Sequence, residues 1–166
     1  MKAREIMTGN PACCTTEDSL EQAANLMAQH DCGCLPVVDG KSGRVVGVVT
    51  DRDIAVRGVA RGQSPAAKVS EVMTASPHTC GPDVDLADVE RTMAERQIRR
   101  MVVVDDAGRC VGMIAQADLA RAAARRGEVT DREVARVVER ISEPAVGASR
   151  LPPSDASRQP ELEQRF

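Results

Sequence analysis

Aromatic side chains are almost absent from this chain of 166 residues: Phe166 is the only one, and there is neither Trp nor Tyr. Platforms for single-stranded nucleic acid stack bases on aromatic faces, so the composition excludes that class of protein. Hydrophobic residues make up 42% of the chain and charged residues 28%, which is ordinary for a globular protein. The composition therefore predicts a folded domain whose core is aliphatic, with Met and Cys as additional core residues.

Long apolar runs and an excess of one charge are also missing. No stretch approaches the roughly 20 residues that span a bilayer, and the N-terminal sequence MKAREIMTGNPA lacks the apolar segment of a secretory signal. A net charge of −3 provides no field that would attract nucleic acid or anionic lipid. We therefore expect a cytoplasmic protein without nucleic-acid or membrane partners, whose six cysteines are mainly reduced.

Motifs for catalysis are not found either. The chain has no Gly-rich phosphate loop of the P-loop kind, no His pair at metal-binding spacing and no nucleophile paired with a base. His30 and His78 stand in no Asp or Ser pattern of a catalytic set, and we expect them to be solvated. These absences predict a protein that is not an enzyme and requires no cofactor.

An internal repeat organises the chain. Residues 5–55 align with residues 71–120, at a shift of 66 positions that becomes 65 after one deletion. The deletion falls in a turn, at 40–43 against 106–108, where a β-hairpin tolerates a change of length. Each copy holds about 50 residues, which is too few to bury much surface alone, so we expect the two copies to pack against each other.

The periodicity within each copy predicts a strand, a helix, two strands and a second helix, which is an α+β fold. Leu20, Ala23 and Met27 follow helical spacing, with Asp18 and Glu21 as the expected capping box. Short β-branched runs on both sides of a Gly-containing turn predict a hairpin in each copy. In sequence letters, these runs are LPVVD and RVVGVV in the first copy and MVVVD and CVGMI in the second. The second helices are expected from Thr50 to about Ala60 and from Gln116 to Arg125.

These patterns predict a first repeat over 1–61, a linker over 62–70 that lies on the surface and a second repeat over 71–126. A further helix is expected over 127–141, capped by Thr130 and Glu133, and a disordered tail over 142–166. The expected helix carries an apolar stripe, which would pack either on the flank of its own module or on a second subunit. Its members are Val134, Val137, Val138 and Ile141.

The segment GVVTDRD, from Gly47 to Asp53, is the strongest candidate for a site. In one interpretation, Thr50 and Asp53 form a reciprocal capping box at the start of a helix and nothing more. In the other, the free amides of the helix N-terminus and a carboxylate suited to a ribose diol bind a nucleotide. Because Asp53 would repel a phosphate, any phosphate must be met by Arg or Lys elsewhere.

The chain resembles the tandem cystathionine-β-synthase (CBS) domain pair, or Bateman module, from Lys2 to about Arg126. The resemblance rests on Met-Thr openings at Met7 and Met73, the LPVVD strand, the signature GVVTDRD and a second copy in the same arrangement. In that family, the Thr and Asp of the signature contact the ribose of an adenosine-containing ligand, and the matching positions here are Thr50 and Asp53.

The resemblance also predicts how the protein works. It implies a regulatory module that binds AMP, ATP, S-adenosylmethionine or NAD between the repeats, forms a homodimer through its helices and signals to a regulated protein. The second copy departs from the signature, because Ala115 replaces the threonine while Asp118 keeps the carboxylate. Losing one hydroxyl contact costs roughly 0.5–1.5 kcal/mol, so we expect a weaker second cleft.

Further residues are expected at the nucleotide cleft, from the signature and from the entrance of the middle strands. Arg99 and Arg100 would clamp a phosphate, or else extend to solvent or pair with Asp105 or Asp106. The full set of additional candidates is Gly47, Arg52, Cys34, Leu35, Pro36, Arg99, Arg100 and Met101.

The cysteines provide a rival hypothesis, a thiol-based redox or zinc sensor on the same scaffold with an empty nucleotide cleft. Its residues would be Cys13, Cys14, Cys32 and Cys34. Their spacing lacks the usual Cys-x-x-Cys loop, and Cys80 matches Cys14 across the repeat, which is typical of a small buried strand residue. The first hypothesis therefore assigns no metal site.

Overall fold

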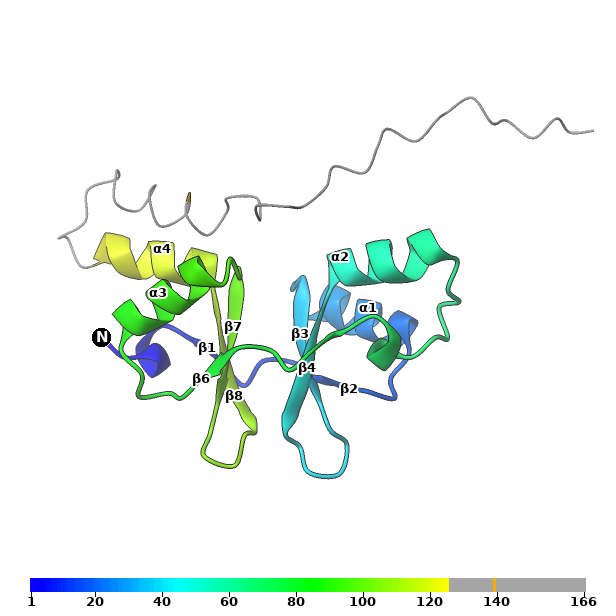
Figure 1. Ribbon diagram of the computed structural model, residues 1–166, viewed down its shortest axis with the longest axis horizontal. Coiled ribbons are helices and arrows are strands. Elements are labelled where there is room, and N and C mark those ends of the chain that lie inside the picture. Colours follow the sequence, from blue (N-terminus) through cyan, green and yellow to red (C-terminus); the bar gives the residue numbers. More distant parts are fainter. Residues whose placement is uncertain (126–138, 140–166) are drawn as a thin grey trace, which may run out of the picture.

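The computed structural model describes residues 1–125 and residue 139 (Figure 1). The first repeat contains β1 (Thr8–Gly9), β2 (Cys14–Thr15), α1 (Leu20–Gln29), β3 (Cys34–Val38), β4 (Val45–Thr50) and α2 (Asp51–Asp53). The second contains β5 (Thr74–Ala75), β6 (Thr79–Cys80), α3 (Leu86–Glu95), β7 (Arg100–Val104), β8 (Cys110–Ala115) and α4 (Gln116–Arg125). This is the predicted α+β fold with two similar repeats. The predicted helix over 127–141, with its stripe, and the tail over 142–166 lie outside the described residues, apart from residue 139.

The two hairpins form the centres of two four-stranded sheets. One sheet has the order β2-β3-β4-β5 and the other β1-β8-β7-β6. Figure 1 shows the β3/β4 and β7/β8 hairpins side by side in the middle of the molecule, with α1 and α2 outside one sheet and α3 and α4 outside the other. Within the described part of the chain, no helix combines the length and apolarity needed to cross a bilayer.

In each sheet, the short strand beside the second strand of the hairpin comes from the other repeat. Thr8 in β1 pairs with Met113 in β8, and Thr74 in β5 pairs with Val48 in β4, both antiparallel. The turn before each short strand lies in the same half of the molecule as that strand. Ala3, before β1, is buried in the core of the second repeat, and Val69, before β5, is buried in the core of the first. The N-terminal segment therefore crosses from one half of the molecule to the other between β1 and β2.

Three apolar clusters hold the described residues together. One lies inside each half between the helices and their sheet, around Leu35 and Val49 in the first and Met101 and Ile114 in the second. The third joins the halves, where Cys34 from β3 packs with residues of β7 and β8. The packing of sheet on sheet removes apolar surface from water that neither small repeat could bury alone.

The start of α1 differs from the prediction by one residue. Ser19 is the N-cap: its Oγ accepts from Gln22 N at 3.1 Å, and Gln22 Oε1 accepts from Ser19 N at 2.8 Å. The expected cap, Asp18, instead accepts a hydrogen bond from Thr15 N at 2.7 Å. The Asp18 carboxylate therefore closes the turn that follows β2, and Asp18 with Glu21 is not the capping box.

The predicted second helix of the first repeat is confirmed in extent but not in regularity. After α2 the chain forms a π-helical turn over Ile54–Gly58 and a 3-10 turn over Val59–Arg61. A Cβ on Gly58 would lie 2.9 Å from Leu20 Cδ1, so only glycine allows this turn to approach α1 so closely. Gly62, with φ of 72°, ends the helical stretch in the left-handed conformation. The linker that follows is exposed as predicted over most of its length, except for buried Val69.

Candidate functional site

A cavity of about 370 Å³ lies where the two repeats meet. Its walls come from the crossing segment after β1, from the loop between α1 and β3, and from β7, β8 and α4 of the second repeat. The lining residues are Thr8, Asn10, Pro11, Ala12, His30, Asp31, Cys32, Gly33, Cys34, Arg100, Met113, Ala115 and Asp118. Of the predicted site residues, the structure therefore brings Asp118, Arg100, Cys34 and Cys32 together at one cavity.

Two left-handed residues shape the walls of this cavity. Asn10 and Asp31 both have φ of 47°, a conformation that Asn and Asp adopt more readily than most residues. Asn10 N donates to Val111 O at 3.2 Å, which holds the crossing segment against β8 before it leaves for β2. The same conformation recurs at Ser76 and Gln97, the equivalent positions of the second repeat.

Asp118 is the one buried charged residue in the described part of the chain. Its Oδ2 accepts a hydrogen bond from Ala115 N at 2.7 Å, and its Oδ1 accepts from the Arg121 guanidinium. Each carboxylate oxygen has two lone pairs, so these bonds leave acceptor capacity. A partly satisfied carboxylate in the wall of a cavity is suited to accept hydrogen bonds from the hydroxyl groups of a ligand.

Arg100 brings positive charge to the same cavity. It begins β7, directly across from Ala115 at the end of β8, and its Nη2 lies 3.5 Å from the point that a Cβ on Gly33 would occupy. That Cβ would also lie 2.8 Å from Asp51 Oδ2, so a side chain at this position would have to displace the Asp51 carboxylate. Gly33 thus lets the Arg100 guanidinium reach the α1–β3 loop of the other repeat, where an anionic group of a ligand would meet it.

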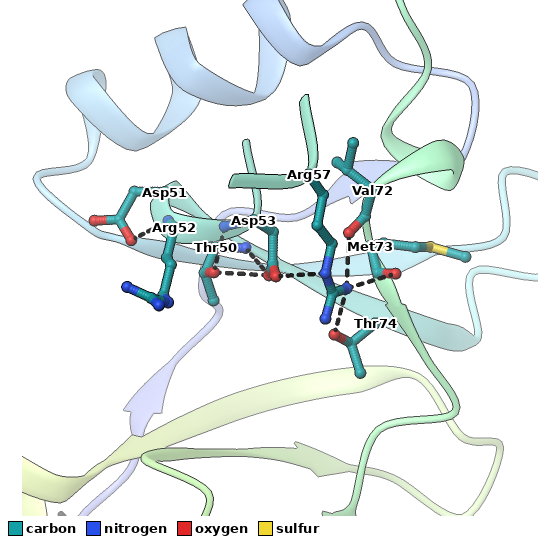
Figure 2. A network of polar contacts seen from close by, with 8 residues as sticks. All are labelled: Thr50, Asp51, Arg52, Asp53, Arg57, Val72, Met73 and Thr74. Carbon is teal, nitrogen blue, oxygen red and sulfur yellow. Dashed lines mark hydrogen bonds and ion pairs between the residues drawn. The ribbon is translucent and has the colours of Figure 1, made fainter. Parts of the chain in front are cut away.

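The predicted ribose pair of the first repeat, Thr50 and Asp53, has internal partners (Figure 2). Thr50 Oγ1 donates to Asp53 Oδ2 at 2.7 Å and accepts from Asp53 N at 3.1 Å, while Thr50 N donates to the same carboxylate oxygen at 3.0 Å. The predicted capping box is therefore confirmed, and the predicted contact of this pair with a ribose stays a prediction. Neither residue lines the cavity described above.

Arg57 occupies the other side of the Asp53 carboxylate. Its Nε lies 3.4 Å from Asp53 Oδ1, and its Nη1 donates to Val72 O at 3.0 Å, Met73 O at 3.3 Å and Thr74 Oγ1 at 3.1 Å. Figure 2 shows the guanidinium between Asp53 and these oxygens. Arg57 therefore ties the helix after β4 to the segment that enters β5.

The second repeat lacks this arginine. Its equivalent is Ala122, and a cavity of about 290 Å³ lies there, lined by Glu5, Ile6, Met7, Asp118, Arg121 and Ala122. The two repeats thus place their carboxylates alike but surround them differently. Asp53 is held by Thr50 and Arg57, whereas Asp118 has no threonine beside it and lines open space on two sides.

The remaining predicted cleft residues lie away from this cavity lining. Leu35 and Met101 are fully buried in the cores of their own repeats. Gly47 lies beneath Met73, Pro36 is buried in β3, and the side chains of Arg52 and Arg99 are exposed. Their predicted contact with a ligand stays a prediction.

The cysteines of the rival sensor hypothesis differ in burial and in their partners. Burial raises the pKa of Cys14 to about 12 and that of Cys34 to about 11, so both thiols stay protonated at neutral pH. Cys13 instead hydrogen-bonds with Cys110 of the second repeat, which lowers the pKa of the Cys13 thiol and raises that of the Cys110 thiol. Among residues 1–125 and 139, no group of three or more His, Cys, Asp or Glu side chains is placed to hold a metal ion.

Sequence reasoning missed the crossing segment and the loop before β3. Thr8, Asn10, Pro11 and Ala12 line the cavity, and so does His30, which is exposed as expected. One signal was present, because the first copy reads MTGNP and the second MTASP in the same register. That signal marks a repeated structural feature but does not say which half of the molecule it contacts.

The comparisons with known proteins agree with this architecture. The CBS domain family model matches the chain twice, over residues 3–58 and 69–125. The chain belongs to the CBS domain family. The CBS domain-containing protein YhcV of Bacillus subtilis is 39% identical over 117 residues, which cover 70% of this chain and 81% of YhcV. The tandem repeat is therefore the CBS pair that the signature sequences indicated.

Two solved CBS-pair structures carry different ligands. The crystal structure of CBSX2 in complex with AMP has a TM-score of 0.67 and 25% identity, covering 76% of this chain and 98% of that one. The crystal structure of Hypoxic Response Protein I with two coordinated zinc ions has a TM-score of 0.66 and 33% identity, covering 73% of this chain and 98% of that one. The same fold thus holds a nucleotide in one relative and a metal in another.

Proposed function

We propose that this CBS pair is a non-enzymatic regulatory module that binds an adenosine-containing small molecule in the cavity between its repeats. The observation that carries the proposal is the placement of Asp118 and Arg100 in the walls of one 370 Å³ cavity built from both repeats. That volume falls within the roughly 300–1,000 Å³ of small-molecule sites. AMP bound to the similar CBSX2 pair supports the choice of ligand class.

The two charged residues suit different parts of such a ligand. The Asp118 carboxylate accepts hydrogen bonds from the ribose hydroxyl groups, and the Arg100 guanidinium meets a phosphate or another anionic group. The replacement of threonine by Ala115 favours this role rather than weakening it. In the first repeat the Thr50 hydroxyl donates to Asp53 at 2.7 Å, whereas Ala115 has no hydroxyl to occupy the equivalent acceptor on Asp118.

Signalling follows from the shared walls. A ligand that contacts the crossing segment and α1–β3 loop on one side and β7, β8 and α4 on the other stabilises one arrangement of the two repeats. Such a ligand shifts the population between arrangements only as far as its affinities for them differ. A regulated protein that binds only one arrangement then responds to whether the cavity holds a ligand.

Titration calorimetry with AMP, ATP, S-adenosylmethionine and NAD on stripped, reduced protein tests the proposal. Asp118→Asn keeps an acceptor for the Ala115 amide but removes the charge, and should weaken binding roughly 10- to 100-fold. Asp53→Asn is its matched control at the equivalent position. Arg100→Gln should weaken the binding of all four, because each carries a phosphate or carboxylate group, and the exposed neighbour Arg99→Gln serves as its control.

The outcomes separate the two carboxylates. Loss of binding in Asp118→Asn but not in Asp53→Asn supports the proposed site, and the reverse result assigns the ligand to Thr50 and Asp53. No heat with any of the four ligands overturns the proposal. Zinc titration on the same protein tests the rival sensor hypothesis, which the zinc-bound relative supports.

A further inference from the structure

Two cysteines from opposite repeats meet beside the cavity. Cys13 lies in the crossing segment, directly after the lining residues Pro11 and Ala12, and Cys110 is the first residue of β8. The thiols hydrogen-bond with each other. Equivalent positions in the repeat hold no cysteine pair, since Thr79 and Val45 stand there.

Strand pairing explains why the two thiols meet. Thr8 and Gly9 pair with Met113 and Gly112, and the next residue, Asn10, donates to Val111 O at 3.2 Å. These contacts hold the start of the crossing segment against β8, the strand that begins at Cys110. The pairing of β1 with β8 therefore brings the segment that carries Cys13 close to Cys110.

Each thiol is also oriented by a backbone carbonyl. Cys13 Sγ lies 3.4 Å from Pro11 O, and Cys110 Sγ lies 3.6 Å from Gly112 O. Because a thiol has one proton, each thiol donates either to its carbonyl or to the other thiol at a given moment. Both side chains are half-buried, so they are accessible to a small reagent. The neighbouring Cys14 is different, because its side chain is buried in the first core and directed toward Pro36 O.

We propose that Cys13 and Cys110 form a reversible disulfide that links the two repeats at the edge of the cavity. The oxidant is a small disulfide of the glutathione class. The Cys13 thiolate attacks one sulfur of the oxidant, forms a mixed disulfide and releases one glutathione thiolate. The released glutathione thiolate takes the proton of the Cys110 thiol, and the Cys110 sulfur attacks the Cys13 sulfur and releases the second glutathione thiolate, which takes up a proton from solvent in place of the one that Cys13 lost. Two protein thiols and one small disulfide thus give one protein disulfide and two small thiols.

The order of these steps follows from the shared hydrogen bond. The Cys110 thiol stabilises the Cys13 thiolate, which lowers the pKa of Cys13 and makes it the attacking group. The bond would fix the segment that carries Asn10, Pro11 and Ala12 in the cavity wall. Any effect on nucleotide affinity rests on the proposed function, whereas formation of the disulfide does not.

Disulfide mapping on the full chain tests the proposal directly. The reduced protein is incubated with oxidised glutathione, its remaining thiols are alkylated, and it is digested with trypsin. Cleavage after Arg109 isolates Cys110 as the only cysteine of peptide 110–121, while Cys13 lies in peptide 5–41. We expect these two peptides to be linked, with two of the six thiols lost and the intact mass that of a monomer.

Variants identify the partner within peptide 5–41, which also contains Cys14, Cys32 and Cys34. Cys13→Ser and Cys110→Ser should each abolish the linked peptide, while Cys80→Ser, which removes another half-buried thiol, should leave it unchanged. A link that persists in Cys13→Ser, a link only between two chains, or no link in the wild type overturns the proposal. The peptide map of the wild-type protein tests the proposal even if a cysteine variant fails to fold.

Calorimetry on the oxidised and reduced protein then separates the two proposals. A linked peptide with no nucleotide binding in either state supports the disulfide and overturns the nucleotide function. Nucleotide binding with no linked peptide supports the nucleotide function and overturns the disulfide. If both are present, we expect oxidation to change the affinity in the wild type and to have no effect in Cys110→Ser.

Discussion

Met73 lies directly against Gly47: a Cβ on Gly47 would come within 2.7 Å of Met73 Sδ and 3.1 Å of Thr74 O. The second repeat repeats the relationship, with Met7 against Gly112. In each case the methionine precedes the short strand that joins the sheet of the other repeat's hairpin. The bare glycine lets that short strand approach closely, so the Met-Thr opening and the signature glycine act as one structural unit.

Gly47→Ala should therefore destabilise the protein. The Met73 thioether can shift, but the Thr74 carbonyl belongs to the paired backbone, and overpacking of this kind costs about 1–3 kcal/mol. The free energy of unfolding from urea denaturation measures the effect. Gly40→Ala is the matched control, because nothing lies within 4 Å of a Cβ there, and equal stability of the two variants would contradict the prediction.

Arg57→Gln should loosen the first repeat. The substitution removes the ion pair with Asp53 and leaves the Val72 and Met73 carbonyl groups without their guanidinium donor. We expect the free energy of unfolding to fall by about 1–2 kcal/mol. Hydrogen exchange should increase around β5 in the same variant. Arg52→Gln, at an exposed arginine of α2, is the control, and a similar loss there would show that the network is unimportant.

Stability should decrease at alkaline pH because of Cys14. Burial raises the pKa of this thiol from its ordinary value of 9.0 to about 12. Below pH 9 the thiol is protonated in both states, but between about pH 9 and 12 only the unfolded state releases the proton, so stability falls as pH rises. Urea denaturation at about pH 8 and about pH 10.5 measures the loss.

The comparison of two variants isolates the Cys14 contribution from that of other groups. Cys14→Ala should lose less stability over this pH interval than the wild type. Val37→Ala removes volume from the same core without removing a thiol, so it should keep the full alkaline loss. An identical pH dependence in the wild type and Cys14→Ala would show that ionisation of this thiol does not contribute.

The predicted homodimer has a candidate surface after α2. Val56 and Val59 are 45% and 71% exposed and, with Met1, are the exposed large apolar side chains of the described residues. We expect light scattering to give twice the 17.7 kDa mass of the chain for the wild type. Val59→Glu should shift the mass toward the monomer, while Lys41→Glu at a hairpin tip should not. A monomeric wild type at high concentration would contradict the prediction.

Local signals in the sequence predicted much of the fold. Short-range spacing identified both hairpins, α1, α3 and α4, and the Thr50–Asp53 capping box, because these features depend on residues within a few positions of each other. The cap of α1 was placed one residue early, since Asp18 and Ser19 are both good capping residues. Only the turn after β2, which uses Asp18, decides between them.

The sequence by itself determined the tandem repeat, its α+β units and the carboxylate at the start of each second helix. The tertiary structure decided which half each short strand joins, because two residues have no periodicity and their partner is set by packing. It also decided that Arg57 holds Asp53 while Asp118 lines open space, and that Cys13 of the first repeat meets Cys110 of the second. These contacts join residues that are distant in the chain, so they exist only once the two halves have packed.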